Sequence, residues 1–262
     1  MKLQIVPAVT GVTWVGLGLR TFVRQPLGMG SLFFGFVILI SLPSIIPVAG
    51  FLIALTLVPA GTVGVMAGAE RAQAGKFPAP SLLFAAWRQG SAQTRSMLLL
   101  GVLYAAAIVA AIAASALVDG GQFAQLYLGR TELTQELASD PAFRSAMWVT
   151  LLLYLPISLA FWHAPALVHW YAVPPLKSIF FSVIAVLRNA GAFLLYGALW
   201  LTLSVTAGVL VLFLAALTGS PALLAVGFFP MGLLVAAMFF TSIWFTFRDS
   251  FLAEPQDPAP PT

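Results

Sequence analysis

Residues 96–118 read SMLLLGVLYAAAIVAAIAASALV, a stretch that contains no charged residue and is long enough to cross a bilayer as one helix. Five further stretches of similar length and polarity occupy most of the remaining chain. We expect membrane-spanning helices at residues 28–45, 48–68, 96–118, 145–167, 191–215 and 222–246. The pattern predicts an all-α, polytopic membrane protein.

The composition of the whole chain agrees with this class. Of its 262 residues 61% are hydrophobic and only 8% are charged, whereas soluble domains carry about 25% charged residues. The net charge of +4 comes from scattered basic residues, not from the clustered patch that nucleic-acid binding needs, so no nucleic-acid partner is expected. Cysteine is absent, which excludes disulfides, thiolate catalysis and cysteine-ligated metals.

The positions of Lys and Arg predict the orientation of the spans. With six spans, ten of the twelve basic residues fall on one face: Lys2, Arg20, Arg24, Arg71, Lys76, Arg88, Arg95, Lys177, Arg188 and Arg248. The opposite face has one sizeable loop, Asp119–Arg144, which holds the other two. Because basic loops stay inside, we expect both termini in the cytoplasm.

A short motif suggests an internal repeat. Arg24-Gln25-Pro26, Arg88-Gln89-Gly90 and Arg188-Asn189-Ala190 each lead directly into an apolar span. The motif predicts three units, at about residues 8–69, 80–168 and 176–251, each an interfacial amphipathic helix followed by a transmembrane hairpin. Arginine near a membrane border is common, so coincidence is the alternative. One membrane domain would cover residues 1–251, and a disordered, proline-rich tail residues 252–262.

The segment before the first span is the clearest amphipathic helix of the three. Its expected polar face carries Thr13, Arg20 and Arg24, and its apolar face Val12, Val15, Leu19, Phe22 and Val23. We expect the apolar face to sink into acyl chains while the arginines reach the headgroups. The third segment, Lys177–Arg188, is apolar nearly all round and is expected to be tucked under the bundle.

Two groups of residues are expected to position the helices. The membrane-interface anchors are Arg20, Arg24, Arg88, Arg188, Trp87 and Trp170. The helix-packing residues are Gly64 and Gly68, a GxxxG pair whose contact lies within the bundle or, less favoured, with another chain. Pro59, Pro165 and Pro230 each fall in the second span of a unit, where static kinks are favoured over hinges.

The sequence contains no recognisable catalytic, cofactor or metal site. His163 and His169 are its only histidines, and their six-residue spacing places them on different sides of a helix, where they cannot jointly ligate a metal. No Asp, Glu, Lys or Arg lies in the middle of any span, which weakens the case for an ion-coupled transporter. We therefore expect a protein without enzymatic activity, cofactor or metal.

Several short elements resemble a known group of proteins. They are the amphipathic helix before each hairpin, Pro59-Ala60-Gly61, Ala164-Pro165-Ala166 and the closing Trp244-Phe245-Thr246-Phe247-Arg248-Asp249. The chain resembles, over about residues 8–251, a group of uncharacterised six-span inner-membrane proteins of proteobacteria. Those proteins are in turn distantly similar to the membrane domain of bacterial glycerophosphodiester phosphodiesterases. The resemblance implies a bacterial inner membrane and a lipid-related or accessory role.

These observations favour an accessory or scaffold protein that packs against membrane lipid or another membrane protein. The alternative is a carrier or permease for an uncharged or amphiphilic solute. A cavity lined by tyrosines and hydroxyls at mid-membrane would favour the carrier, and a filled bundle with an exposed apolar face would favour the accessory protein.

Overall fold

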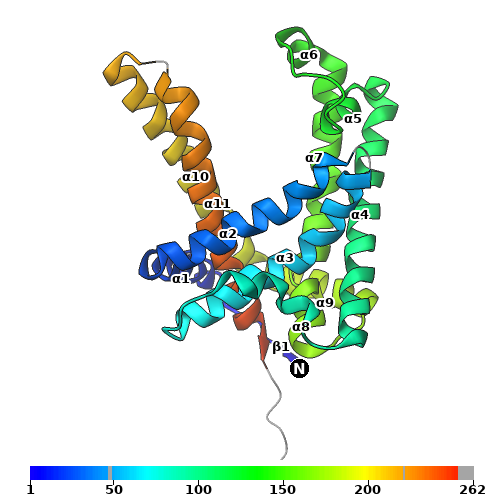
Figure 1. The fold of residues 1–262 in the computed structure, drawn as a ribbon, viewed down its shortest axis with the longest axis vertical. Coiled ribbons are helices and arrows are strands. Elements are labelled where there is room, and N and C mark those ends of the chain that lie inside the picture. Colours follow the sequence, from blue (N-terminus) through cyan, green and yellow to red (C-terminus); the bar gives the residue numbers. More distant parts are fainter. Residues whose placement is uncertain (47–48, 221, 253–262) are drawn as a thin grey trace, which may run out of the picture. The chain divides into compact units, whose positions relative to one another are not determined.

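The computed structural model describes residues 1–46, 49–220 and 222–252, and within these the chain is almost entirely helical (Figure 1). The elements in order are β1 (Lys2–Leu3), α1 (Thr10–Arg24), α2 (Pro26–Ser41), the 3-10 helix η1 (Leu42–Ile45), α3 (Ala49–Gln73), the 3-10 helix η2 (Pro80–Trp87), α4 (Ser91–Asp119), α5 (Gln122–Tyr127), α6 (Gln135–Ser139), α7 (Pro141–Phe161), α8 (Ala164–Tyr171), α9 (Pro175–Arg188), α10 (Ala190–Thr218), α11 (Ala222–Ser250) and β2 (Phe251–Leu252). Of the expected disordered tail, Leu252 belongs to β2 and residues 253–262 lie outside the described part.

Six helical stretches are long and apolar enough to cross a membrane: Pro26–Ile45, Ala49–Gln73, Ser91–Asp119, Pro141–Tyr171, Ala190–Thr218 and Val226–Ser250. Each overlaps one of the spans expected from the sequence. The expectation of an all-α protein with six apolar spans is confirmed.

The contacts divide the chain into two compact units. Unit 1 comprises Met1–Phe33, Val65–Leu82 and Ile184–Thr262, and unit 2 comprises Phe34–Gly64 and Leu83–Val183. Helices α2, α3 and α9 each pass from one unit to the other. The single membrane domain and its three repeat units stay predictions.

In unit 1, α1 packs against α10 and α11 (Figure 1). Two glycines allow this close approach, because a methyl group at Gly11 would lie 2.9 Å from the backbone nitrogen of Tyr196, and one at Gly18 would lie 2.9 Å from the Cα of Ser242. Between them Trp14 is fully buried, and its Nε1 donates a hydrogen bond to Asp249 Oδ2 at 3.0 Å.

The apolar face of α1 that was expected to contact acyl chains is divided in the structure. Val15 and Phe22 are buried, but Val12 and Val23 from the same expected face are exposed. The face of α1 that packs against other helices is centred on Trp14 and Gly18. Its position is set by small residues that let helices approach closely and by one large aromatic ring, and not by hydrophobicity alone.

The two ends of the described chain lie side by side in unit 1. Strands β1 and β2 form an antiparallel pair in which Lys2 is opposite Leu252 and Leu3 is opposite Phe251. Asn189, at the start of α10, holds the segment that follows β1: its Oδ1 accepts from Val6 N at 2.8 Å, and its Nδ2 donates to Gln4 O at 3.0 Å. The first and last described residues of the chain therefore lie on the same side of this unit.

Unit 2 is built around α4, which packs along α7 and also contacts α5 and α8 (Figure 1). Its hydrophobic core combines residues of α3, η2, α4 and α8: Ala60, Val63, Ala86, Met97, Leu100, Ala164 and Val168. The segment expected to be the second interfacial helix is here the 3-10 helix η2, whose Leu83 and Ala86 are buried.

The fourth expected span, 145–167, is interrupted in the structure. α7 ends at Phe161 and α8 begins at Ala164, so Pro165 lies in the first turn of α8, where proline is tolerated, and not at a kink within a helix. Ser182 of α9 bridges the break: its Oγ accepts from His163 N at 2.9 Å and donates to Leu159 O at 2.8 Å. Pro59 and Pro230 do lie inside helices, α3 and α11.

Helix α9 also departs from the expected apolar character. Its buried side carries two serines, Ser178 and Ser182, both fully buried, while Lys177 and Arg188 at its ends are exposed. The serines bond to backbone carbonyls, which allows hydroxyl groups to lie where the sequence pattern suggested only hydrocarbon.

Candidate functional site

The candidate site is a pocket of about 430 Å³ in unit 2. Helices α3, α4, α5 and α7 supply its walls: Leu55, Tyr104, Ile108, Ala111, Ile112, Phe123, Tyr127, Met147, Trp148, Thr150, Leu151 and Tyr154. The α4 side is the buried one, with Ile108, Ala111 and Ile112 all below a tenth exposed. Most of the lining is apolar or aromatic, with three tyrosine hydroxyls.

The short helix α5 is held against the pocket by the end of α4. Asp119, the last residue of α4, is buried, and its carboxylate accepts from the backbone nitrogens of Gly121 at 2.8 Å and Phe123 at 2.6 Å. These bonds hold Gly121, the residue before α5, and Phe123 in its first turn, where a negative charge is favourable. They position the Phe123 and Tyr127 rings, whose centroids are 6.0 Å apart.

Aromatic contacts fix the tyrosines on the pocket walls. The Tyr127 ring meets the Phe51 ring edge-on at 5.8 Å, and the Tyr104 ring meets the Phe161 ring edge-on at 5.1 Å. Tyr104 of α4 and Tyr154 of α7 both line the pocket and lie near each other. Burial raises the pKa of Tyr127, so its hydroxyl is protonated at neutral pH and can donate a hydrogen bond.

The pocket offers few other polar groups. Thr150 Oγ1 donates to Ala146 O in its own helix at 3.0 Å. Among the described residues that line the pocket none carries a charged side chain. The site can therefore bind by shape and by neutral hydrogen bonds only.

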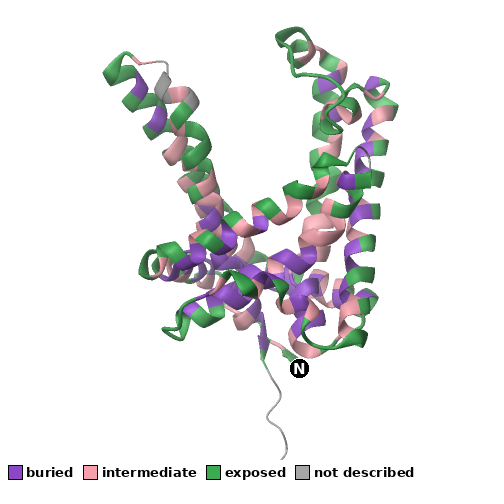
Figure 2. Cartoon of the chain, viewed as in Figure 1, coloured by how far each residue is buried: buried purple, intermediate pink, exposed green. Residues whose placement is uncertain are grey.

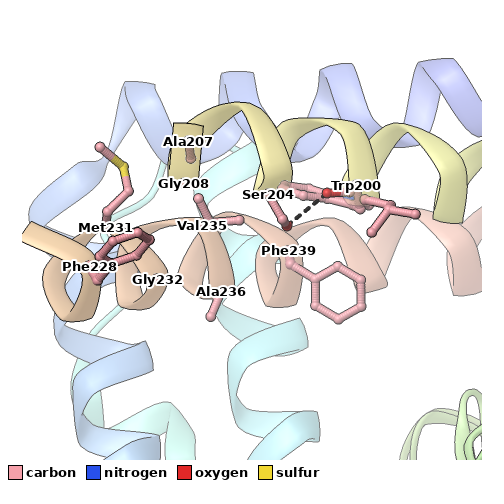
Figure 3. Close-up of a pocket in the computed structure, with 11 residues that line it drawn as sticks. Trp200, Ser204, Ala207, Gly208, Phe228, Met231, Gly232, Val235, Ala236 and Phe239 are labelled. Atoms are coloured by element: carbon pink, nitrogen blue, oxygen red, sulfur yellow. Dashed lines mark hydrogen bonds between the residues drawn. The ribbon is translucent and has the colours of Figure 1, made fainter. Parts of the chain in front are cut away.

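A second hollow of about 410 Å³ lies between α10 and α11 in unit 1 (Figure 3). Phe228, Met231 and Phe239 of α11 form one side of it, and Trp200 and Ala207 of α10 form part of the other. Ser204 Oγ, its polar side chain, donates to Trp200 O at 2.8 Å within α10. The hollow is thus lined almost wholly by hydrocarbon.

The predicted anchor residues fall into two classes. Arg20, Arg24, Arg88 and Arg188 are all exposed, as headgroup-facing side chains would be. Trp87 and Trp170 are instead half-buried, and both pack against the hydrophobic core of unit 2. Their role as membrane-interface anchors stays a prediction.

The predicted packing glycines are both buried in α3. A methyl group at Gly68 would overlap the side chain of Leu32 in α2, so this glycine packs within unit 1. Gly64 belongs to unit 2. The helix contact expected of the GxxxG pair as a whole stays a prediction.

The amide residues of the three Arg-[Gln/Asn] motifs make contacts that the sequence did not indicate. Gln25 Nε2 donates to Lys76 O at 3.2 Å, Gln89 Nε2 lies 3.1 Å from His169 Nε2, and Asn189 holds the N-terminal segment. The recurrence of an amide after each arginine was the available signal. Within the described residues, no group of three or more His, Cys, Asp or Glu side chains could hold a metal ion.

Comparison with known proteins gives one informative result. No family model matches the chain, and no solved structure matches it. A probable inner membrane protein of Burkholderia thailandensis is 37% identical over 267 residues, a match that covers 100% of this chain and 98% of the relative. The chain belongs to this family of inner-membrane proteins.

Because the chain belongs to a family of inner-membrane proteins, its six apolar helices are assigned to the inner membrane. The expectation of a multi-pass inner-membrane protein is confirmed, whereas the likeness to the membrane domain of glycerophosphodiester phosphodiesterases stays a prediction. The tyrosine-lined pocket then lies on helices of membrane-spanning length, α4 and α7, with α5 at the end of α4.

Proposed function

We propose that the protein is a non-enzymatic accessory or scaffold subunit of the bacterial inner membrane, and that it packs through α10 and α11 against lipid or another membrane protein. The burial of its helices carries this proposal. In the most apolar window of α10 11% of the residues are buried, and in that of α11 22%, against 44% in α3. Figure 2 displays most of this hairpin as exposed or intermediate away from α1.

The composition of the exposed side supports a packing role. α10 presents many large aliphatic and aromatic side chains that are each more than two-fifths exposed: Leu194, Leu201, Val205, Val209, Leu210, Leu212, Phe213, Leu214 and Leu217. Extended apolar surfaces of this kind mark contact with lipid or with a partner protein.

The proposed topology has both termini in the cytoplasm and three hairpins, each preceded by an interfacial helix. The pairing of β1 with β2 supports an even number of spans, because it places residues 2–3 beside residues 251–252. The excess of Lys and Arg on that side supports a cytoplasmic location.

Photocrosslinking in native membranes tests the accessory role. A photoreactive residue would replace Leu201, Val205 or Val209, all exposed on α10, and the control position is Val211, which is buried on the same helix. We expect the exposed positions to crosslink reproducibly to one membrane protein and the control position not to. Adducts with bulk phospholipid alone, in the ratio of the surrounding bilayer, would contradict contact of α10 with another membrane protein.

A carrier for an uncharged or amphiphilic solute is the second candidate, and the tyrosine-lined pocket of unit 2 favours it. Transport requires that a solute bound there reach both faces of the membrane. Proteoliposomes loaded with a neutral amphiphile test this directly: protein-dependent exchange would support the carrier, and exchange equal to that of protein-free vesicles would exclude it for that solute.

A further inference from the structure

We propose that the pocket between α3, α4, α5 and α7 is a binding site for an uncharged amphiphile, a molecule with an apolar body and a hydroxyl or carbonyl oxygen at one end. The inference rests on the lining of this pocket alone. Neither a protein partner on α10 nor transport across the membrane is needed for it.

The size and the walls of the pocket suit such a molecule. Its volume of about 430 Å³ lies in the range of about 300–1,000 Å³ that small-molecule sites occupy. Side chains from four helices surround it, and α5 is fixed in place by the two hydrogen bonds to Asp119. An apolar body would contact Ile108, Ile112 and Leu151 on opposite walls.

The absence of charge in the described lining selects against ionic ligands. A carboxylate or ammonium group in this pocket would lose its hydration without gaining an opposite charge, which is unfavourable in apolar surroundings. The nearby carboxylate of Asp119 is already engaged by the amides of Gly121 and Phe123. A neutral ligand avoids this cost.

The tyrosine hydroxyls define where the polar end of the ligand would bind. Each tyrosine hydroxyl can donate one hydrogen bond and accept others, so Tyr104 and Tyr154, which line the pocket from α4 and α7, can offer a donor to the ligand. Thr150 does not compete, because its hydroxyl bonds within α7. The pocket thus offers an oxygen atom of the ligand a hydrogen bond beside a large apolar wall. In the hollow between α10 and α11 the one hydroxyl of the described lining, that of Ser204, bonds within its own helix.

Photolabelling of the purified full-length protein tests the site. Three diazirine probes of equal chain length are compared: a fatty alcohol, a quinone-tipped alkane and a fatty acid. We expect saturable labelling of α4, α5 or α7 peptides by the alcohol, the quinone or both, at least tenfold stronger than by the fatty acid at a pH where the acid is ionised. The alcohol and quinone arms separate a lipid-like ligand from a quinone-like one.

Variants locate the site on the named residues. Leu151→Trp should fill the pocket and abolish saturable labelling, whereas Leu152→Trp changes the next residue, which is exposed and outside the lining, and should leave labelling intact. The double variant Tyr104→Phe/Tyr154→Phe keeps both rings and should weaken labelling about tenfold, since it removes the hydrogen bond to the ligand. Equal labelling by the fatty acid, or labelling that does not saturate and is unchanged by Leu151→Trp, would overturn the proposal. Binding without exchange across vesicles would support the site and exclude the carrier.

Discussion

Asn189 illustrates how a single side chain joins distant parts of unit 1. It is 2% exposed, and its amide pairs with the backbone of the N-terminal segment as a neighbouring strand would, through one acceptor and one donor. The adjacent Arg188 is exposed. In this motif the amide, and not the arginine, makes the contact that orders the chain end.

Replacement of Asn189 by leucine should release the N-terminal segment. The backbone N–H of Val6 and C=O of Gln4 would lose their partner, at a cost of about 1–3 kcal/mol. We expect a lower melting temperature in detergent and faster hydrogen exchange at the Val6 amide. Arg188→Gln, at the exposed neighbouring position, is the control and should change neither. Unaltered exchange in Asn189→Leu would mean that the segment is held by other contacts.

The sequence indicated the position of these amides but not their role. The repeated Arg-[Gln/Asn] motif was recognised because arginine is expected near a membrane border. Which residue of each motif forms a contact depends on a partner 51 to 185 positions away, such as Lys76 for Gln25 or Gln4 for Asn189. Local sequence carries no information on such partners, and this is also why the pocket formed by Tyr104 and Tyr154 was not predicted.

Helix α1 shows how packing between elements departs from a hydrophobicity pattern. The pattern located an amphipathic helix and assigned its apolar face to acyl chains; Val12 and Val23 of that face are exposed, whereas Val15 and Phe22 are buried against protein. Close contact with α10 and α11 depends on Gly11 and Gly18, which carry no hydrophobic signal. A periodic pattern cannot distinguish a side that faces lipid from a side that faces protein.

Two alanine substitutions in α1 distinguish the effect of close helix contact on stability from the effect of helix propensity. At Gly18 an added methyl would overlap Ser242 of α11, and overpacking of this kind costs about 1–3 kcal/mol. At Gly16 nothing lies within 4 Å, so alanine should stabilise the helix by up to about 1 kcal/mol. Melting temperatures in detergent should therefore fall for Gly18→Ala and rise or stay unchanged for Gly16→Ala. A fall of equal size in both variants would contradict the packing described for α1.

A second prediction at the scale of the elements concerns the break between α7 and α8. Ser182→Ala should destabilise the protein by about 1–3 kcal/mol, because the His163 N–H and the Leu159 C=O would lose their bridge in an apolar setting. Ser178→Ala is the matched control: this serine is also fully buried in α9, but its hydroxyl bonds only to Pro175 O in its own helix. Thermal unfolding should show the larger loss for Ser182. Equal losses would indicate that the bridge contributes nothing specific.

For the whole molecule, the apolar composition of the six spans was the feature from which most of the fold could be predicted. The six apolar stretches are helical, one with a short break, because backbone groups in hydrocarbon must find partners within the protein, most simply in the same helix. The interruption at residues 162–163 was missed because a bonding partner on another helix, Ser182, makes the break possible. The short pairing of β1 with β2 was also missed, since two-residue strands have no detectable pattern.

The central claim is a six-span inner-membrane protein with both termini in the cytoplasm. Reporter fusions after Gln125, in the loop between α4 and α7, and after Phe251, in β2, test it directly. The account predicts alkaline phosphatase activity, and no fluorescence of green fluorescent protein, for fusions after Gln125, with the reverse for fusions after Phe251. The same signal at both sites would contradict the six-span topology.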